Sequence, residues 1–133
     1  MNDAQTQLLS DLGKCLGPKA LITDQAAIEP WLTDWRGRVH GQAAAILAPS
    51  TTDEVVDIVT LAAERRVPLV AQGGNTGMVA GATPPEDGSA LLLSTRRMNR
   101  IRSISAEDRV AVAEAGVILA DLHERAHEAG MRF

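Results

Sequence analysis

The stretch QGGNTG, residues 72–77, follows directly on the apolar residues 68–71 and decides how this chain folds. Glycine lets the backbone reach positive φ angles and approach a ligand without a Cβ in the way, so that successive N–H groups can point into one concavity. Such a concavity binds anions, and phosphate is its natural guest. The sequence therefore predicts an anion-binding turn at a strand end, assisted by the side chains of Asn75 and Thr76.

Two familiar phosphate-binding loops do not fit this spacing. A Walker A loop needs Lys followed by Ser or Thr after its last glycine, and a dinucleotide fold needs GxGxxG; neither pattern can be placed on residues 73–81. Pro84 and Pro85 follow soon afterwards, which argues against a long helix that begins at this turn and points its dipole at the anion. The donors are therefore expected to be mostly backbone N–H groups.

The residues before the turn predict a βαβ unit. Residues 43–48 are a continuous apolar run, residues 51–66 form a helix with Thr51 as N-cap, and residues 67–71 form the strand that enters the turn. The helical spacing predicts an inward face made of Val55, Ile58, Val59, Ala62 and Ala63. Ligands bind at the carboxyl edge of such sheets, which is where the turn lies.

The remaining segments predict a fold class of α/β passing into α+β. Residues 90–94 read as a third strand, and residues 101–104 and 109–115 as a hairpin. A helix over residues 118–129 is expected to turn Leu119, Leu122 and Ala126 inward and to end at Gly130. Residues 82–89 are expected to form a surface loop.

The N-terminal part predicts an amphipathic helix over residues 3–16, followed by an arm or long loop over residues 23–42. Cys15 falls on the apolar side of this helix. We expect it to be a small buried hydrophobe rather than a reactive thiol.

Three blocks, QGGNTGMVAG (72–81), LLLSTRRMNRI (91–101) and EAGV (114–117), resemble the FAD-linked oxidase family that includes D-lactate and D-2-hydroxyglutarate dehydrogenases. Their order and spacing agree with that family, and the resemblance covers nearly the whole chain. It implies a PCMH-type FAD-binding domain, present here as its N-terminal part. Residues 1–42 would be the N-terminal helix and arm, and residues 43–133 the first portion of the FAD-binding domain, with the rest of that domain and the substrate domain missing.

The resemblance also implies the site. In the family the first glycine loop holds the FAD diphosphate, a role that falls here on Gly73, Gly74, Asn75, Thr76 and Gly77, with Gln72, Met78 and Gly81 as flanking candidates. Some relatives with this fold attach the flavin covalently through a histidine after the paired glycines. Asn75 occupies that position, so noncovalent FAD is expected. The same resemblance places Ser94, Asn99 and Gly116 near the flavin, although each also has a structural role.

The implied parent protein is a FAD-dependent oxidoreductase that oxidises a D-2-hydroxy acid, such as D-lactate, D-2-hydroxyglutarate or glycolate, to the 2-oxo acid. No carboxylate or histidine is marked by its spacing as an acid or base, so no catalytic residue is assigned. The chain alone is expected to be an inactive fragment whose exposed face offers a surface for a homo-oligomer, and the electron acceptor is not identified. The alternative is a non-catalytic nucleotide- or phosphate-binding module, because the turn itself requires only an anion.

Composition limits the other possibilities. A net charge of −4 and a pI near 5.3 provide no basic field for nucleic acid. The single Cys15 cannot form an internal disulfide, and with no apolar signal run the expected setting is cytoplasmic, with peripheral membrane association of the parent left open. No stretch is long and apolar enough to span a membrane.

One competing motif is HExxH, spelled by residues 123–127 on a predicted helix. Two histidines four residues apart with a glutamate between them are typical of zinc hydrolases. A catalytic zinc needs a third protein ligand, however, and His40 is the only other histidine. We therefore interpret His123 and His127 as surface histidines and expect no metal.

Overall fold

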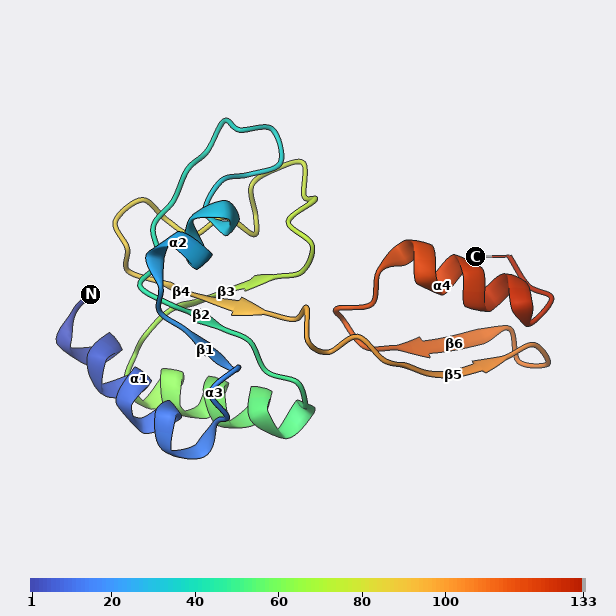
Figure 1. Ribbon diagram of the computed structural model, residues 1–133, viewed down its shortest axis with the longest axis horizontal. Coiled ribbons are helices and arrows are strands. Elements are labelled where there is room, and N and C mark those ends of the chain that lie inside the picture. The colour runs from blue at the N-terminus through green and yellow to red at the C-terminus, as the bar shows by residue number, and fades with distance from the viewer. Residues whose placement is uncertain (133) are drawn as a thin grey trace.

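The structure is a computed structural model that describes residues 1–132. Figure 1 shows two units joined by a short connection, a sheet unit (residues 1–94) and a hairpin unit (residues 101–128). The sheet unit contains α1 (Asp3–Cys15), β1 (Leu21–Ile22), α2 (Gln25–Ile28), the 3-10 helix η1 (Glu29–Trp31), β2 (Ile46–Leu47), α3 (Thr52–Glu64), β3 (Leu69–Gln72) and β4 (Leu91–Ser94). The hairpin unit contains β5 (Ile101–Ser105), β6 (Val110–Ala113) and α4 (Leu119–Glu128). This arrangement confirms the predicted passage from α/β to α+β.

The sheet has the strand order β1-β2-β4-β3. Strands β2, β4 and β3 run parallel, and β1 pairs antiparallel with β2. The predicted strand-helix-strand succession is present as β2, α3 and β3, but β4 lies between the two strands instead of beside them. The predicted strand over residues 43–48 is reduced to Ile46–Leu47, although its flanking backbone still bonds, from Ala48 N–H to the Ala20 carbonyl.

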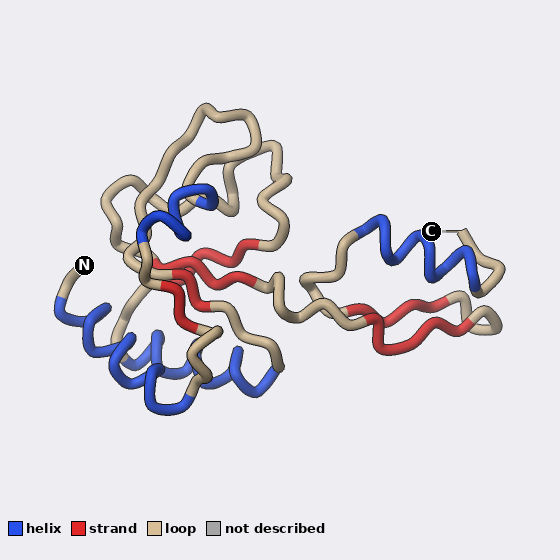
Figure 2. Tube along the Cα trace, viewed as in Figure 1, coloured by secondary structure: helices blue, strands red, loops and turns tan. Residues whose placement is uncertain are grey.

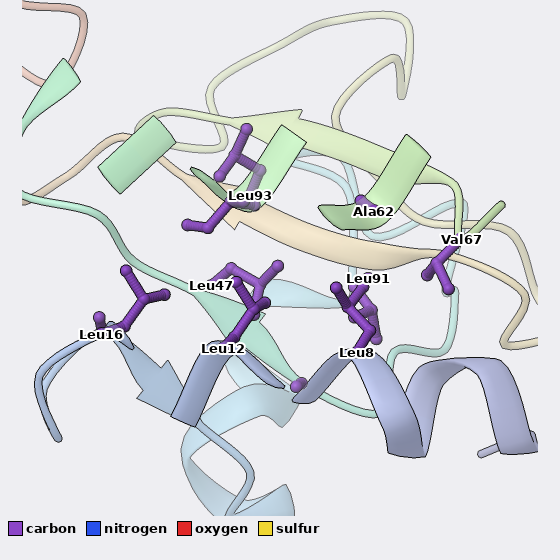
Figure 3. Packing of buried hydrophobic residues seen from close by; sticks show 11 residues of the cluster. Leu8, Leu12, Leu16, Leu47, Ala62, Val67, Leu91 and Leu93 are labelled. Carbon is purple, nitrogen blue, oxygen red and sulfur yellow. The ribbon is translucent and has the colours of Figure 1, made fainter. Parts of the chain in front are cut away.

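Side chains of the central strands alternate between two apolar layers, as the pleat of a strand requires. On one face Leu47, Leu91 and Leu93 pack with Leu8 and other residues of α1 and α3 (Figure 3). On the opposite face Ile46 and Leu92 pack with α2 and the residues that follow it. Helices therefore cover both faces of this small sheet, which explains why all four residues of β4 are buried.

Helix α3 begins as predicted, but its inward face is narrower than predicted. The Thr51 side chain accepts a hydrogen bond from Glu54 N–H, and Glu54 in turn accepts from Ser50. Only Ile58 and Ala62 are buried, whereas Val59 is 46% exposed. The helix rests on a short sheet with α1 beside it (Figure 2), and besides Ile58 and Ala62 it contributes Leu61, which packs partly buried against the same core.

Two further expectations were wrong in the sheet unit, and a third was right in part. Cys15 is exposed, because α1 buries Leu8 and Leu12 and turns the cysteine aside. Residues 23–42 are not simply a loop, since they contain α2 and η1. Residues 82–89 form the expected loop, with Pro85, Glu86 and Asp87 exposed, but Pro84 is fully buried against Gly41, where an added Cβ would lie 1.8 Å from the Pro84 carbonyl oxygen.

The hairpin unit contains the predicted strands and helix, but fewer of its side chains are buried than predicted. Strands β5 and β6 pair antiparallel, and α4 ends at Glu128, with Gly130 just after the C-cap as predicted and at a φ of +74°. Of the three α4 residues expected to face inward, Ala126 is buried, Leu122 is half-buried and Leu119 is 57% exposed. Every residue of β6 is exposed.

Candidate functional site

The candidate site lies at the carboxyl edge of the sheet. Because β3 and β4 are parallel and Gln72 is in register with Ser94, the chain leaves both strands at the same edge. Thr95 N–H then donates to the Gln72 carbonyl, 3.0 Å away, which holds the carboxyl ends of β3 and β4 together. Figure 1 shows β3 and β4 pointing toward the hairpin unit. The glycine loop, residues 73–81, thus begins at the edge where ligands bind in open α/β sheets.

The glycine loop reaches its shape differently from the prediction. Positive φ angles occur at Asn75 (56°) and Ala80 (55°), and none of the loop glycines has one. Asparagine tolerates this left-handed conformation better than most residues do. Its side chain also fixes the turn, because Asn75 Nδ2 donates to the Thr33 carbonyl at 2.7 Å. No helix follows β3 between residues 73 and 90, all of which the structure describes, in agreement with the predicted use of backbone donors.

Gln72 holds the two ends of the glycine loop together. The residue is 2% exposed, and its Nε2 donates to the carbonyls of Ala82 (2.9 Å) and Trp31 (3.0 Å). One amide thus ties the start of the loop both to its far end and to η1. The hydrogen-bonding capacity of this nitrogen is used within the protein.

The loop glycines are not required by the packing of the folded chain. A Cβ added at Gly77 or Gly81 would meet nothing within 4 Å, and at Gly73 or Gly74 only ordinary contacts at 3.7 and 3.8 Å. Gly116 is the opposite case, because its Cβ would lie 2.0 Å from the Thr95 carbonyl oxygen. Neither the φ angles nor the packing of the folded chain requires glycine in the loop. The glycines instead leave open space above the loop, which would let a ligand approach the backbone closely.

A cavity of about 590 Å³ opens beside the glycine loop. Gly74 and Thr76 line it together with Asn99 and Gly116, so segments from all three blocks of the family resemblance meet there. The other predicted loop residues, Gln72, Gly73, Asn75, Gly77, Met78 and Gly81, are not among its lining residues. The lining also contains Arg96, a residue that the sequence analysis did not single out.

Arg96 is held in place by two contacts. Its guanidinium lies over the Trp31 ring, 3.4 Å from the ring centre, and its Nε donates to Ser94 Oγ at 3.1 Å. Burial lowers the pKa of this guanidinium below its ordinary value, but arginine remains protonated at neutral pH. A fixed positive charge therefore stands at the cavity wall. The only feature of the sequence that could have pointed to Arg96 was its position inside the LLLSTRRMNRI block.

Glu114 directly precedes Ala115 and Gly116, which line the cavity where the chain leaves the hairpin. Its carboxylate is 1% exposed and accepts hydrogen bonds from the side chains of Arg100 and Arg102 and from Arg100 N–H. The Arg100 side chain is the main cause that lowers the pKa of Glu114 from 4.5 to about 2. Gly116 N–H then donates to the Met98 carbonyl, which places the segment that lines the cavity.

Two other places could be taken for sites. A second cavity, of about 580 Å³, is lined by His40 and Glu29, whose side chains meet at 2.8 Å, and by none of the predicted site residues. His123 and His127 lie on α4, and within residues 1–132 no group of three or more His, Cys, Asp or Glu side chains is placed to hold a metal. Neither place involves the glycine loop.

The pattern of the FAD binding domain family matches residues 43–133, which is more than half of the chain. The chain belongs to the FAD-binding domain family. The mitochondrial D-2-hydroxyglutarate dehydrogenase of Bos taurus is 40% identical over 113 residues, covering 85% of this chain and 20% of the relative. That of Arabidopsis thaliana is 37% identical over 107 residues, covering 80% and 19%. The chain thus spans about a fifth of the length of these relatives.

The fold of this FAD-binding domain is also found in solved flavoprotein structures. The structure of p-cresol methylhydroxylase with substrate bound superposes with a TM-score of 0.81 at 18% identity, covering 98% of this chain and 26% of that one. These comparisons confirm the resemblance to FAD-linked oxidases and the PCMH-type fold.

The expected cytoplasmic setting was wrong, because the bovine and Arabidopsis relatives are mitochondrial enzymes by name. The single Cys15 excludes only a disulfide within this chain and does not identify a compartment. Among residues 1–132, no helix has the length and hydrophobicity needed to cross a membrane.

Proposed function

We propose that this chain is the FAD-binding part of an oxidoreductase that oxidises a D-2-hydroxy acid, of the D-lactate, D-2-hydroxyglutarate or glycolate type, to the 2-oxo acid. The names of the relatives support this substrate class. Because the chain spans about a fifth of their length, the reaction is proposed for the parent protein, and this chain alone is expected to be inactive.

The observation that carries the proposal is the open glycine loop at the sheet edge. Its backbone N–H groups at Gly73, Gly74, Thr76 and Gly77 would hold the FAD diphosphate, with Met78 and Gly81 flanking it. The side chains of Gln72 and Asn75 serve this site by fixing the shape of the loop. When bound, the flavin supplies the hydride acceptor, while the protein supplies binding and orientation.

We propose that the FAD is held without a covalent bond. Asn75 stands where some members of this fold have the histidine that attaches the flavin, and its amide side chain already donates to Thr33. An amide is a far weaker nucleophile than imidazole. Protein precipitated with acid should therefore lose its yellow colour to the supernatant, and colour retained in the pellet would contradict noncovalent binding.

Two organisational proposals accompany this function. Residues 1–42 would form an N-terminal extension, and residues 43–133 the first portion of the FAD-binding domain. The exposed valines of β6, Val110 and Val112, would offer a surface for self-association. Analytical ultracentrifugation of this chain over a range of concentrations tests the second proposal, and a monomer throughout contradicts it.

The central test measures FAD binding by the full-length gene product. Purified protein should show visible flavin absorbance, and Gly77→Val should abolish FAD binding because the new side chain would occupy the open space above the loop. Gly17→Val is the matched control, since a Cβ at Gly17 also meets nothing within 4 Å and Gly17 lies outside the loop. Both variants should unfold at the wild-type temperature.

If Gly77→Val binds FAD as the wild type does, the loop is not the diphosphate site. If the wild type binds phosphates but no flavin, the non-catalytic binding module is the better description. A panel of D-2-hydroxy acids, monitored by bleaching of the flavin absorbance, then identifies the substrate.

A further inference from the structure

Arg96 differs from Arg100 and Arg102 in how its charge is balanced. Arg100 and Arg102 are 68% and 51% exposed at their side chains, and both pair with Glu114. Arg96 is less exposed and takes part in none of the ion pairs found among residues 1–132. Burying a charge is costly unless it is paired, so this guanidinium is poised for an anionic partner.

The contacts of Arg96 leave its outer nitrogens available for that partner. Nε donates to Ser94 Oγ and the flat face lies against Trp31, whereas no hydrogen bond from Nη1 or Nη2 occurs within the described part of the chain. Trp31 is itself tied to the glycine loop, because its carbonyl accepts from Gln72 Nε2. Trp31 therefore contacts both the Arg96 guanidinium, through its ring, and Gln72 at the start of the glycine loop, through its carbonyl.

The cavity next to Arg96 is lined in part by the glycine loop, and few acidic side chains line it. Gly74 and Thr76 line it with Arg96, and among residues 1–132 Asp121 of α4 is the only carboxylate in the lining. A loop of backbone N–H groups provides partial charges for an anion, and a guanidinium adds a full charge with geometry suited to phosphate oxygens.

We propose that Arg96 is a binding residue for the diphosphate of FAD, acting together with the glycine loop. This inference rests on the proposed function, and it adds a side-chain cation to a site otherwise made of backbone donors. Trp31 is the positioning residue that holds the guanidinium toward the cavity wall.

The test titrates FAD and riboflavin into the apo form of the full-length protein. Arg96→Gln should weaken FAD binding roughly 10- to 100-fold, the usual effect of losing a charge-assisted hydrogen bond. Arg96→Lys keeps the charge and should recover most of the affinity. Riboflavin has no phosphate, so its affinity should be the same in all three proteins. Wild-type affinity for FAD should also fall more steeply with salt than that of Arg96→Gln.

The matched control is Arg109→Gln, which removes the same charge from the exposed turn between β5 and β6 and should leave FAD binding unchanged. FAD affinity of Arg96→Gln equal to wild type overturns the inference while leaving the proposed function intact. An equal loss for riboflavin, or no recovery in Arg96→Lys, also overturns it. A wild type that binds no FAD overturns the proposed function and this inference together.

Discussion

Strands β4 and β6 are both short and largely aliphatic, yet they have opposite surroundings. β4 reads LLLS and is buried at every residue, whereas β6 reads VAVA and is exposed at every residue. β4 has a partner strand on each side and helices over both faces, while β6 has β5 alone. Aliphatic sequence therefore does not determine burial, which depends on what other elements the chain brings to each face.

The same contrast holds for the two units as wholes. The sheet unit is held by two apolar layers, and the hairpin unit is held at its base by a buried carboxylate between two arginines. Apolar layers are insensitive to pH and ion pairs are not. The two units should therefore respond differently to the same perturbation.

The largest expected effect comes from opening a cavity in the sheet unit. Leu92→Ala removes a side chain that is fully buried in the centre of β4 and should lower the free energy of unfolding by about 2–5 kcal/mol. Leu119→Ala removes the same atoms from a 57% exposed position in α4 and should change it by about 0.5 kcal/mol or less. Urea denaturation measures both. Equal losses would mean that the hairpin unit has a core of its own.

A smaller effect is expected at the joint between the units. Gly116→Ala places a Cβ against the Thr95 carbonyl, so the backbone must shift, at a cost of roughly 1–3 kcal/mol. Gly77→Ala has free space and should change stability by about 0.5 kcal/mol or less. Thermal unfolding of the two variants compares them directly. A stable Gly116→Ala protein would show that the joint is loose.

Glu114→Gln should weaken the hairpin unit while leaving the sheet unit intact. The neutral amide loses the charge that pairs with Arg100 and Arg102, so backbone amides of β5 and β6 should exchange hydrogen faster. Amides of β3 and β4 serve as the internal control. Equal acceleration in both units would show that they unfold together.

The pH dependence of this effect has a definite sign. Folding lowers the pKa of Glu114 from 4.5 to about 2, because hydrogen bonds from Arg100 stabilise the ionised form. Its contribution is therefore complete above the unfolded pKa and is lost as pH falls from about 4.5 toward 2. Protection factors of the β5 and β6 amides, which correct for the pH dependence of intrinsic exchange, should fall over that interval in the wild type, and the fall should be smaller in Glu114→Gln.

The smallest effect is expected in the glycine loop. Asn75→Ala removes the hydrogen bond to Thr33 and strains the backbone at φ 56°, while Asn75→Gly removes only the bond. The free energy of unfolding of Asn75→Ala should therefore be lower than that of Asn75→Gly by about 1 kcal/mol. Thermal unfolding detects this difference. Identical stabilities would mean that the loop relaxes to another conformation.

Sequence patterns predicted the features of this fold that depend on neighbours along the chain. The Thr51 cap, the turn of the hairpin and the end of α4 just before Gly130 all follow from local chemistry. The glycine loop was found in the same way, because glycine spacing is visible in the sequence itself.

Features that depend on distant residues could not be read from the sequence. The position of β4 between β2 and β3 and the exposure of Val59 depend on which elements pack together. The contact between Arg96 and Trp31 joins residues far apart in the chain, so no local spacing indicates it. The left-handed angle at Asn75 was missed because glycine was the expected place for it.

The strand order has a consequence for the time course of synthesis. β4, which ends at Ser94, is the partner strand of β3 and the parallel partner of β2. During translation, β3 therefore leaves the ribosome with no strand to pair with until about twenty further residues have been added. The parallel part of the sheet can therefore form only once β4 has emerged, and β3 presents unpaired edges until then.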